Sequence, residues 1–391
     1  MISLAEAQAR LLALVTPVAT EEVSLLEANG RWVAADVFAN RTQPAKTLSA
    51  MDGYAIRAGD GPEWKVIGES AAGRSFPGAT GPGEAVRIFT GAALPSGCDA
   101  IVIQENITRK NDQIRQTDGA PPADGDHTRP AGSDFTAGDC LIPAGSRINA
   151  AKIALAAMAG HGTLPVRRKI RVALLSTGDE LMPPGQPVDE DHIPASNGIM
   201  IAAMLAGWPV EIIDPGIVPD TMEATRAAIA AAHDCDVIVT IGGASVGDHD
   251  LVRPALIAEG AALDFWKVAL RPGKPVMVGT LGRAITLGLP GNPVSAFVTC
   301  LLFLKPLIAA LSGASDALPE VQSATLGGTL PANGERLDFV RACVVNGLVE
   351  AVGTSDSAAL RALSKSNILI MRAPGATPAK RGDVVDIIRT A

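Results

Sequence analysis

The sequence IRVALLSTGDE, at residues 170–180, decides the fold of this chain. Its apolar first part is typical of a buried strand, and a polar turn follows directly. A second apolar run, at 237–241, is followed by the glycine-rich sequence GGASVGDHD at 242–250. Helical patterns separate such runs, and this alternation predicts an open, mostly parallel sheet covered by helices.

The same alternation extends from residue 170 to about residue 312. Strands are predicted at 170–176, 210–213, 237–241 and 284–289. Helices are predicted at 198–206, 221–232, 250–258 and 293–311. Thr221 is expected to cap the second of these helices.

The flanking segments predict different structures. Ser3 and Glu6 have the spacing of a capping box, so an amphipathic helix is expected to begin the chain. Residues 43–130 carry short apolar runs, at 64–67 and 100–103, between Gly, Pro and Asp, as expected of a small β-rich module. An Ala-rich helix is predicted at 148–160. After Gly313, short apolar runs at 339–345, 368–371 and 384–388 predict a separate small β domain.

Composition limits the possible functions. The 391 residues exceed what one hydrophobic core usually supports, so two to four domains are expected. The net charge of −8 and the aromatic content of 3% argue against a nucleic-acid partner. No apolar run is expected to span a bilayer, because Glu211 and Lys305 interrupt the best candidates. We therefore expect a protein of the cytoplasm with no membrane partner.

The cysteines support the same expectation. The five cysteines are widely scattered and form no C-x-x-C pair. This distribution favours reduced thiols over a disulfide framework. The five histidines are equally dispersed, which makes a zinc site improbable.

Ligands of open α/β sheets bind beyond the carboxyl ends of the strands, so the loops after the predicted strands are the candidate site. The turn at 176–180 supplies two hydroxyls and two carboxylates, although such a turn is commonly only a helix cap. The stretch 242–250 brings three glycines, which let a backbone approach an anion, and Asp248, which suits Mg²⁺ beside a phosphate. A turn that requires positive φ is the alternative interpretation of this stretch.

The third loop, LPGNPVS at 289–295, precedes a helix. Asn292 is a natural N-cap and Pro293 suits the first helical position. The helix is therefore expected to present free amides to an anion at the same edge, unless the stretch is a purely structural turn. The sequence RPGKP at 271–275, with Lys267 upstream, is the strongest basic cluster and suits phosphate or molybdate. Solvated surface residues are the alternative.

Two further stretches, at 49–55 and 87–92, lie in the β-rich module. The first carries Asp52 in a loop of small residues. Turn chemistry alone explains either of them. The sequence contains no P-loop, no H-E-x-x-H and no G-x-S-x-G. The residues by themselves thus predict a multidomain α/β protein that binds a phosphorylated anion, with Mg²⁺.

Seven stretches in order give the chain a resemblance to a known family. They are SAMDGYA at 49–55, TGAALPSGCDAIVIQE at 90–105, STGDEL at 176–181, SNG at 196–198, GGASVGDHD at 242–250, RPGKP at 271–275 and LPGNPVSA at 289–296. Together they make the sequence similar to the MoeA and gephyrin E family of molybdopterin molybdenumtransferases over essentially its whole length.

The resemblance implies a fold of four domains. These are an elongated, discontinuous N-terminal domain, an inserted β-rich domain, a central α/β (MogA/MoaB-like) molybdopterin-binding domain and a C-terminal β-barrel-like domain. Their expected boundaries are 1–42 with 131–170, 43–130, 171–318 and 319–391. It also implies an elongated homodimer, with the site between the second domain of one subunit and the third and fourth of the other.

The implied reaction is transfer of molybdenum from molybdate to adenylylated molybdopterin, with release of AMP and with Mg²⁺ as cofactor. The implied catalytic residues are Asp52, Thr90, Asp134, Glu180, Asp220, Asp248, Lys267, Arg271 and Arg336. Those implied to bind Mg²⁺ are Glu180, Asp220 and Asp248. Those implied to hold the substrate are Thr177, Gly178, Gly242, Gly243, Ser245, Gly247, Lys274, Pro290, Gly291 and Asn292.

Three positions depart from the family pattern. Arg271 stands where the family tends to carry Lys, Arg361 stands where a small hydroxyl residue is usual, and the stretch before residue 49 lacks an aromatic residue. A paralogue that handles tungstate, a molybdopterin adenylyltransferase and a non-catalytic scaffold are the alternatives. A molybdopterin adenylyltransferase is also the expected transient partner.

Overall fold

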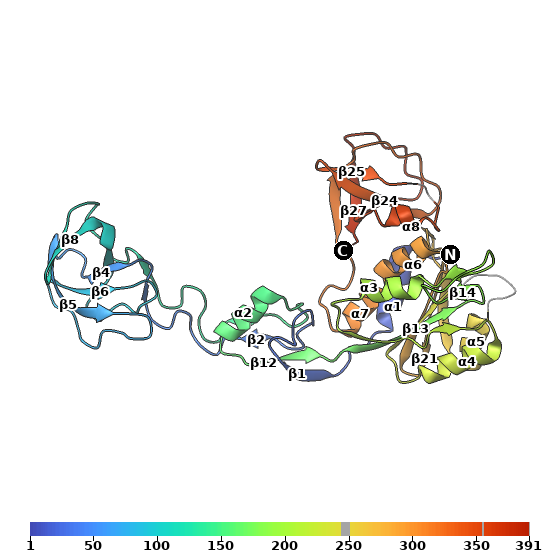
Figure 1. Cartoon of the computed structure of the whole chain (residues 1–391), viewed down its shortest axis with the longest axis horizontal. Helices are drawn as coiled ribbons and strands as arrows, with labels where there is room; N and C mark the ends of the chain where they lie inside the picture. Colours follow the sequence, from blue (N-terminus) through green and yellow to red (C-terminus); the bar gives the residue numbers. More distant parts are fainter. Residues whose placement is uncertain (244–250, 354–355, 391) are drawn as a thin grey trace.

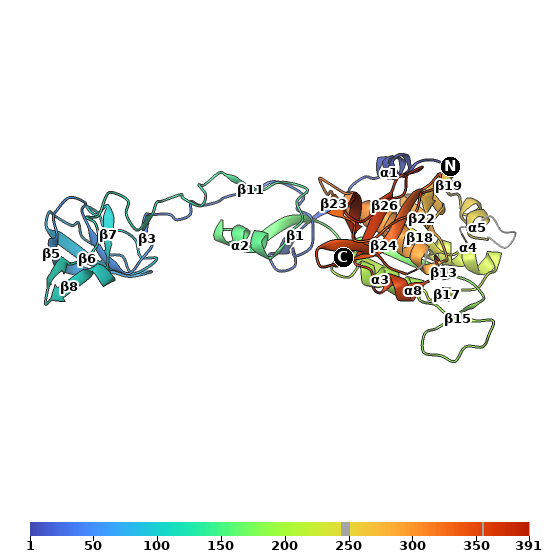
Figure 2. The same ribbon diagram turned by 90° about the horizontal axis from the view of Figure 1, so that it is seen from above.

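The computed structural model describes residues 1–243, 251–353 and 356–390, and the chain is elongated in both views (Figures 1 and 2). A small β module lies at one end, a narrow arm leads from it, and the α/β unit and a C-terminal β unit lie at the other end. The predicted multidomain α/β fold is confirmed.

The α/β unit contains a seven-stranded sheet. Its strand order is β16 (Val210–Ile213), β13 (Ile170–Thr177), β18 (Val237–Ile241), β22 (Ala284–Leu289), β21 (Pro275–Leu281) and β19 (Ala262–Lys267), with β17 (Ile217–Val218) also paired to β13. The first four strands are parallel, as predicted, whereas β21 and β19 are antiparallel and were not predicted.

Helices cover both faces of this sheet. One face packs against α3 (Asn197–Met204) and the run formed by α6 (Pro293–Thr299), the π-helical turn η2 (Cys300–Leu304) and α7 (Lys305–Leu311). The other face packs against α4 (Met222–Ala231) and α5 (Val252–Ala258). Thr221 caps α4 as predicted, since its hydroxyl accepts the amide of Ala224 at 3.2 Å.

The expected N-terminal helix is α1 (Leu4–Ala13), and the hydroxyl of Ser3 accepts the amide of Glu6 at 3.1 Å. Its apolar residues Leu4, Ala7 and Leu11 belong to the same core as α6, η2 and α7. The first helix of the chain therefore packs on the α/β unit, far along the sequence from its neighbours.

One expectation about apolar runs is wrong. Residues Pro293–Leu311 form a helical stretch that is long and apolar enough, by composition, to cross a membrane, despite Lys305. However, 83% of its most apolar window is buried inside the protein. The hydrophobic core of the α/β unit thus accounts for its apolar character.

The arm consists of chain segments that run outward and return. Strand β1 (Thr20–Ser24) pairs with β12 (Thr163–Arg167), β2 (Val37–Phe38) with β11 (Cys140–Ile142), and β3 (Leu48–Ser49) with β10 (Thr128–Arg129). Helix α2 (Ala150–Met158), capped by Asn149, packs beside them as the predicted Ala-rich helix.

The distal β module contains one six-stranded sheet. Its order is β7 (Ala100–Ile103), β4 (Gly53–Ile56), β6 (Glu84–Ile88), β5 (Glu63–Ser70), β9 (Gln113–Gln116) and β8 (Ile107–Lys110), with the turn η1 (Gln104–Asn106) between β7 and β8. Trp64 is buried in its core with Tyr54 and Ile114.

The C-terminal unit forms a closed ring of strands, as the expected barrel-like fold requires. The sheet runs β20 (Leu270–Arg271), β24 (Leu337–Val345), β26 (Ile368–Arg372), β27 (Val384–Arg389) and β23 (Val321–Thr325), and α8 (Leu360–Leu363) lies beside it. Strand β25 (Leu348–Ala351) pairs with β24, and its Val349 also bridges to Leu326, just after β23.

All five cysteines are free, as predicted.

We expect Gly53→Ala to destabilise the distal module. A Cβ at Gly53 would lie 2.1 Å from the carbonyl oxygen of Val102 on the neighbouring strand, so β4 and β7 would have to separate. The cost should reach about 3 kcal/mol or more. Urea unfolding followed by tryptophan fluorescence, to which the buried Trp64 of the module contributes, measures it. Gly162→Ala, where a Cβ meets nothing within 4 Å, is the control. Equal stability of both variants would contradict the expectation.

Candidate functional site

Three loops meet at one edge of the parallel sheet. Ser176 of β13 pairs with Ile241 of β18, which in turn pairs with Leu289 of β22. The three strands therefore end at the same level, and their loops begin side by side. A cavity of about 850 Å³ opens there.

Most residues predicted on these loops line the cavity. They are Thr177, Gly178, Glu180, Asp220, Gly242, Gly243, Pro290, Gly291 and Asn292. Ala358 and Leu360 of the C-terminal unit complete one wall. Ser245, Gly247 and Asp248, which were also predicted, lie outside the described residues. The cavity is large enough for a cofactor-sized ligand.

Glycine allows two of the loops to approach each other closely. Gly242 has φ +93°, and a Cβ there would lie 2.9 Å from the carbonyl oxygen of Thr177. The amide of Gly242 donates to the carbonyl of Leu289 at 3.1 Å. The backbone of Gly242 thus joins all three loops, and the positive φ of Gly242 and of Gly243 (+59°) also fits the alternative of a turn that requires positive φ.

The first loop does not cap a helix, because the strand β14 (Leu181–Met182) follows it and pairs with β15 (Ile193–Pro194). Asp179 accepts the amide of Asp220 at 3.0 Å and so holds the loop after β17 against the first loop. Glu180 and Asp220 consequently both face the cavity. The functional interpretation of this acidic turn is favoured over the helix-cap interpretation.

The third loop differs from its prediction in two respects. Asn292 occupies the N-cap position and Pro293 the first turn, but the Asn292 side chain makes no capping hydrogen bond. The amide of Val294 donates to the carbonyl of Ser357 at 3.0 Å. One of the helix amides expected to be free for an anion is therefore taken by the C-terminal unit.

A residue with no predicted role positions the third loop. The side-chain amide of Asn197, at the start of α3, donates to the carbonyl of Gly291 at 2.6 Å. A Cβ at the next residue, Gly198, would lie 3.1 Å from the hydroxyl of Ser176, so glycine lets α3 come close to the end of β13. The SNG motif at 196–198 was the signal, but its spacing alone does not show this contact.

The basic cluster does not line the cavity, apart from Pro275. Arg271 forms an ion pair with Asp338, its neighbour on β24, and this contact raises the pKa of Arg271. The ammonium of Lys267 lies 4.7 Å from the centre of the Trp266 ring, and Arg336 donates to the carbonyl of Leu270 at 3.4 Å. Lys274 is exposed. These cations lie where the α/β and C-terminal units join, with Arg271 engaged by a carboxylate.

The predicted residues from the first half of the chain are also apart from the cavity. Asp52 and Thr90 lie in the distal module, and Asp134 lies in the arm beside it. All three are at the end of the molecule opposite the α/β unit that holds the cavity (Figure 1). Asp52 accepts both the amide and the hydroxyl of Thr90 at 2.8 Å. The backbone bond, followed by the hydroxyl, lowers the pKa of Asp52.

The described residues contain no group of three or more His, Cys, Asp or Glu that could hold a metal ion by themselves. Glu180 and Asp220 nevertheless share one cavity. Mg²⁺ commonly takes only one or two protein carboxylates, with the rest of its ligands from water and substrate. The donor set at this edge of the sheet is compatible with that mode of binding.

Together, the fold and the cavity define an α/β protein that binds a ligand at the carboxyl ends of its parallel strands, with an arm, a distal module and a C-terminal barrel. Three family profiles match it: "MoeA N-terminal region (domain I and II)" at residues 2–160, "Probable molybdopterin binding domain" at 173–310 and "MoeA C-terminal region (domain IV)" at 323–389. The chain belongs to the MoeA family.

Relatives with assigned names agree with this family assignment. The molybdopterin molybdenumtransferase of Haemophilus influenzae is 36% identical over 95% of this chain and 94% of its own length. That of Nostoc sp. is 35% identical over 95% of this chain and 88% of its own. The crystal structure of the molybdopterin biosynthesis MoeA protein from Pyrococcus horikoshii is 26% identical, with a TM-score of 0.86 over the whole of both chains.

We expect Thr90→Val to raise the pKa of Asp52 while leaving it below its ordinary value of 3.8, because the backbone amide still donates. Because the pKa of Asp52 is lowered in the folded module, its ionised carboxylate stabilises the module at pH values above 3.8. This stabilisation is lost as the pH falls through the lowered pKa. NMR titration of the Asp52 carboxyl measures the change, with Asp60 as internal reference. An unchanged pKa would show that the hydroxyl has no part in the pair.

Proposed function

We propose that this protein is a molybdopterin molybdenumtransferase, which transfers molybdenum from molybdate to adenylylated molybdopterin and releases AMP in molybdenum cofactor biosynthesis. The observation that carries the proposal is the cavity in which Gly242, Gly291, Glu180 and Asp220 come together at the ends of parallel strands. The named relatives share this chain over nearly its full length.

The cavity suits a phosphate-linked substrate. The backbone amide of Gly243 and the side chain of Asn292 supply neutral donors to phosphate oxygens, whereas the amide of Gly242 is already taken by the carbonyl of Leu289. We propose that Thr177, Gly178, Pro290 and Gly291 shape the rest of this cradle, and that Ser245 and Gly247 continue it. The separation of AMP requires negative charge to be stabilised at the leaving oxygens, which these donors support without a covalent intermediate.

We propose Mg²⁺ as the cofactor, held by Glu180 and Asp220 together with Asp248. When bound, the ion would neutralise charge on the phosphate oxygens. The two described carboxylates have the oxygen chemistry that this ion prefers. Without the ion, these carboxylates would only repel the negatively charged substrate, so activity should depend on Mg²⁺.

We propose that Lys267, Arg271, Lys274 and Arg336 attract molybdate at the junction of the α/β and C-terminal units. Their position beside the cavity, rather than in it, suits a second substrate that arrives separately. The pairing of Arg271 with Asp338 limits its share of this attraction, because its charge is already partly neutralised.

A homodimer explains the distal residues. Asp52, Thr90 and Asp134 are too far along the elongated chain to reach the cavity of their own subunit (Figure 1). An antiparallel pairing of two such chains would carry the distal module of one subunit to the cavity of the other. We propose this arrangement, with a molybdopterin adenylyltransferase as transient partner that delivers the adenylate.

We also propose that the chain folds as four domains, at 1–42 with 131–170, 43–130, 171–318 and 319–391. Separate hydrophobic cores in the arm, the distal module and the C-terminal ring support this division. Helix α1 departs from this division, because it packs on the core of the α/β unit although it lies within residues 1–42.

The test of the proposed function is AMP release from adenylylated molybdopterin by the purified protein, with Mg²⁺, with and without molybdate. We expect release that depends on molybdate. Glu180→Gln and Asp220→Asn should each lower it by about 100-fold or more. Glu223→Gln, an exposed carboxylate in the first turn of α4, is the matched control and should have little effect.

No AMP release, despite tight binding of the adenylate, would overturn the transferase proposal and favour a scaffold. Release that responds to tungstate but not to molybdate would instead favour the specialised paralogue. Formation of the adenylate from its precursor would favour an adenylyltransferase.

A complementation experiment tests the dimer. Asp52→Ala and Glu180→Gln should each be inactive alone, because each destroys both sites of its homodimer. Co-expression should restore about a quarter of wild-type activity, since half of the dimers are mixed and each has one intact site of two. Separate affinity tags on the two chains allow the mixed dimer to be isolated. No restored activity in that dimer would contradict a shared site.

A further inference from the structure

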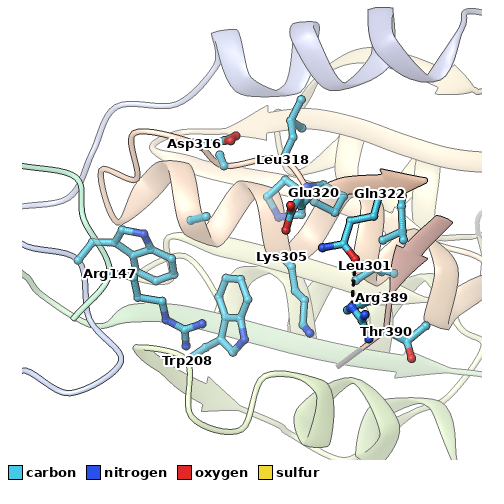
Figure 3. Close-up of a pocket in the computed structure, with 16 residues that line it drawn as sticks. Arg147, Trp208, Leu301, Lys305, Asp316, Leu318, Glu320, Gln322, Arg389 and Thr390 are labelled. Atoms are coloured by element: carbon cyan, nitrogen blue, oxygen red, sulfur yellow. Dashed lines mark hydrogen bonds between the residues drawn. The ribbon is translucent and has the colours of Figure 1, made fainter. Parts of the chain in front are cut away.

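A second cavity, of about 360 Å³, lies at the junction of three parts of the chain (Figure 3). The arm contributes Trp32 and Arg147, the α/β unit contributes Trp208 and Lys305, and the C-terminal unit contributes Arg389 among others. None of its lining residues lines the larger cavity. The proposed reaction therefore leaves this second cavity without a role.

Arg147 connects the arm to the α/β unit at this cavity. Its guanidinium lies 5.0 Å from the Trp32 ring centre and 4.9 Å from that of Trp208. It also donates to the carbonyls of Gly30 and Gly207, each at 3.0 Å. Burial lowers the pKa of Arg147. This cation is thus fixed in place by both units but has no carboxylate partner in the described part of the chain.

Lys305, on α7, is a second partly buried cation. Its ammonium lies 5.4 Å from the Trp208 ring centre. It forms no ion pair with residues 1–243, 251–353 or 356–390. Burial is the main cause that lowers the pKa of Lys305, and the nearby positive charge of Arg147 lowers it further. A counter-ion at this position would relieve both effects.

Arg389 completes the group. Its Nε donates to the side-chain oxygen of Gln322 at 3.1 Å, and its other guanidinium nitrogens make no hydrogen bond within the described part of the chain. Figure 3 shows the ends of Lys305 and Arg389 pointing toward the same side of the cavity, whereas Asp316 lies at the other side. Asp316 and Glu320 line the cavity without pairing with these cations in the described residues.

We propose that this cavity is a binding site for a phosphate group, either as the inorganic ion or as part of a small organic phosphate. Lys305 and Arg389 hold the phosphate oxygens through charge-assisted hydrogen bonds, and the positive charge of Arg147, which also lies against Trp208, adds attraction. The volume lies within the range of cavities that hold small organic molecules. Arg147 and Lys305 both lie close to the Trp208 ring.

Occupancy would have a structural consequence. The three cations come from three parts of the chain, so a bound phosphate links the arm, the α/β unit and the C-terminal unit at one point. A ligand that binds only the assembled arrangement stabilises it in proportion to its free concentration. Phosphate should therefore stabilise the orientation of the arm.

The test is isothermal titration calorimetry of the full-length protein with inorganic phosphate at low ionic strength. We expect saturable binding that Lys305→Met and Arg389→Gln each weaken by about tenfold or more, because each removes a charged hydrogen-bond donor. Lys305→Met keeps the apolar stem against Trp208. Arg381→Gln, an exposed cation on the same C-terminal unit outside the cavity, is the control and should bind as the wild type does.

Titration with ribose 5-phosphate, with ribose as the control that lacks a phosphate, distinguishes the two sources of the phosphate. Tighter binding of ribose 5-phosphate than of phosphate assigns the site to an organic phosphate, and equal binding assigns it to the free ion. Phosphate should also raise the thermal midpoint of the wild type but not of Lys305→Met. Absence of saturable binding, or equal binding by wild type and a folded Lys305→Met, would overturn the proposal.

Discussion

The parallel register of β13, β18 and β22 is the constraint on which the rest of the structure depends. Because Ser176, Ile241 and Leu289 lie on one hydrogen-bonded row, three polar loops must begin at the same edge. Each loop follows a strand that is buried on both faces, so the polar side chains gather where these strands end. The cavity is a result of this alignment, and Gly242 allows its walls to approach without a clash.

The arm separates the distal module from the α/β unit. The α/β unit supplies the cavity, while the distal module has its own core around Trp64 and carries Asp52 away from that cavity. A short arm would allow the module to fold back on its own subunit. A long arm made of paired strands favours contact with a second copy instead, which is the physical basis of the proposed dimer.

Local sequence predicted the parts of the fold that depend on local chemistry. The apolar runs at 170–176, 237–241 and 284–289 form central strands, and Ser3 and Thr221 cap helices as expected. Most loop residues predicted for the site line the cavity for the same reason, because the ends of parallel strands meet at one edge.

Contacts between distant segments could not be predicted in this way. The basic cluster at 271–275, with Lys267, does not predict the two antiparallel strands beside it; Asp264 interrupts the apolar pattern of β19, and β21 pairs with strands that its own apolar residues do not identify. Nothing near Arg271 shows that Asp338 pairs with it, and nothing near Val294 shows that Ser357 takes its amide. Asn197 had no predicted role because its partner, Gly291, lies 94 residues away.

The packing of α1 has a consequence for the order in which the chain is made. The side-chain amide of Gln8 donates to the carbonyl of Leu302, a residue that leaves the ribosome 294 positions later. Until then the apolar face of α1 has no permanent partner, although the arm and the distal module can already fold. During synthesis the first helix thus waits for the last part of its core, which is completed only when η2 reaches it.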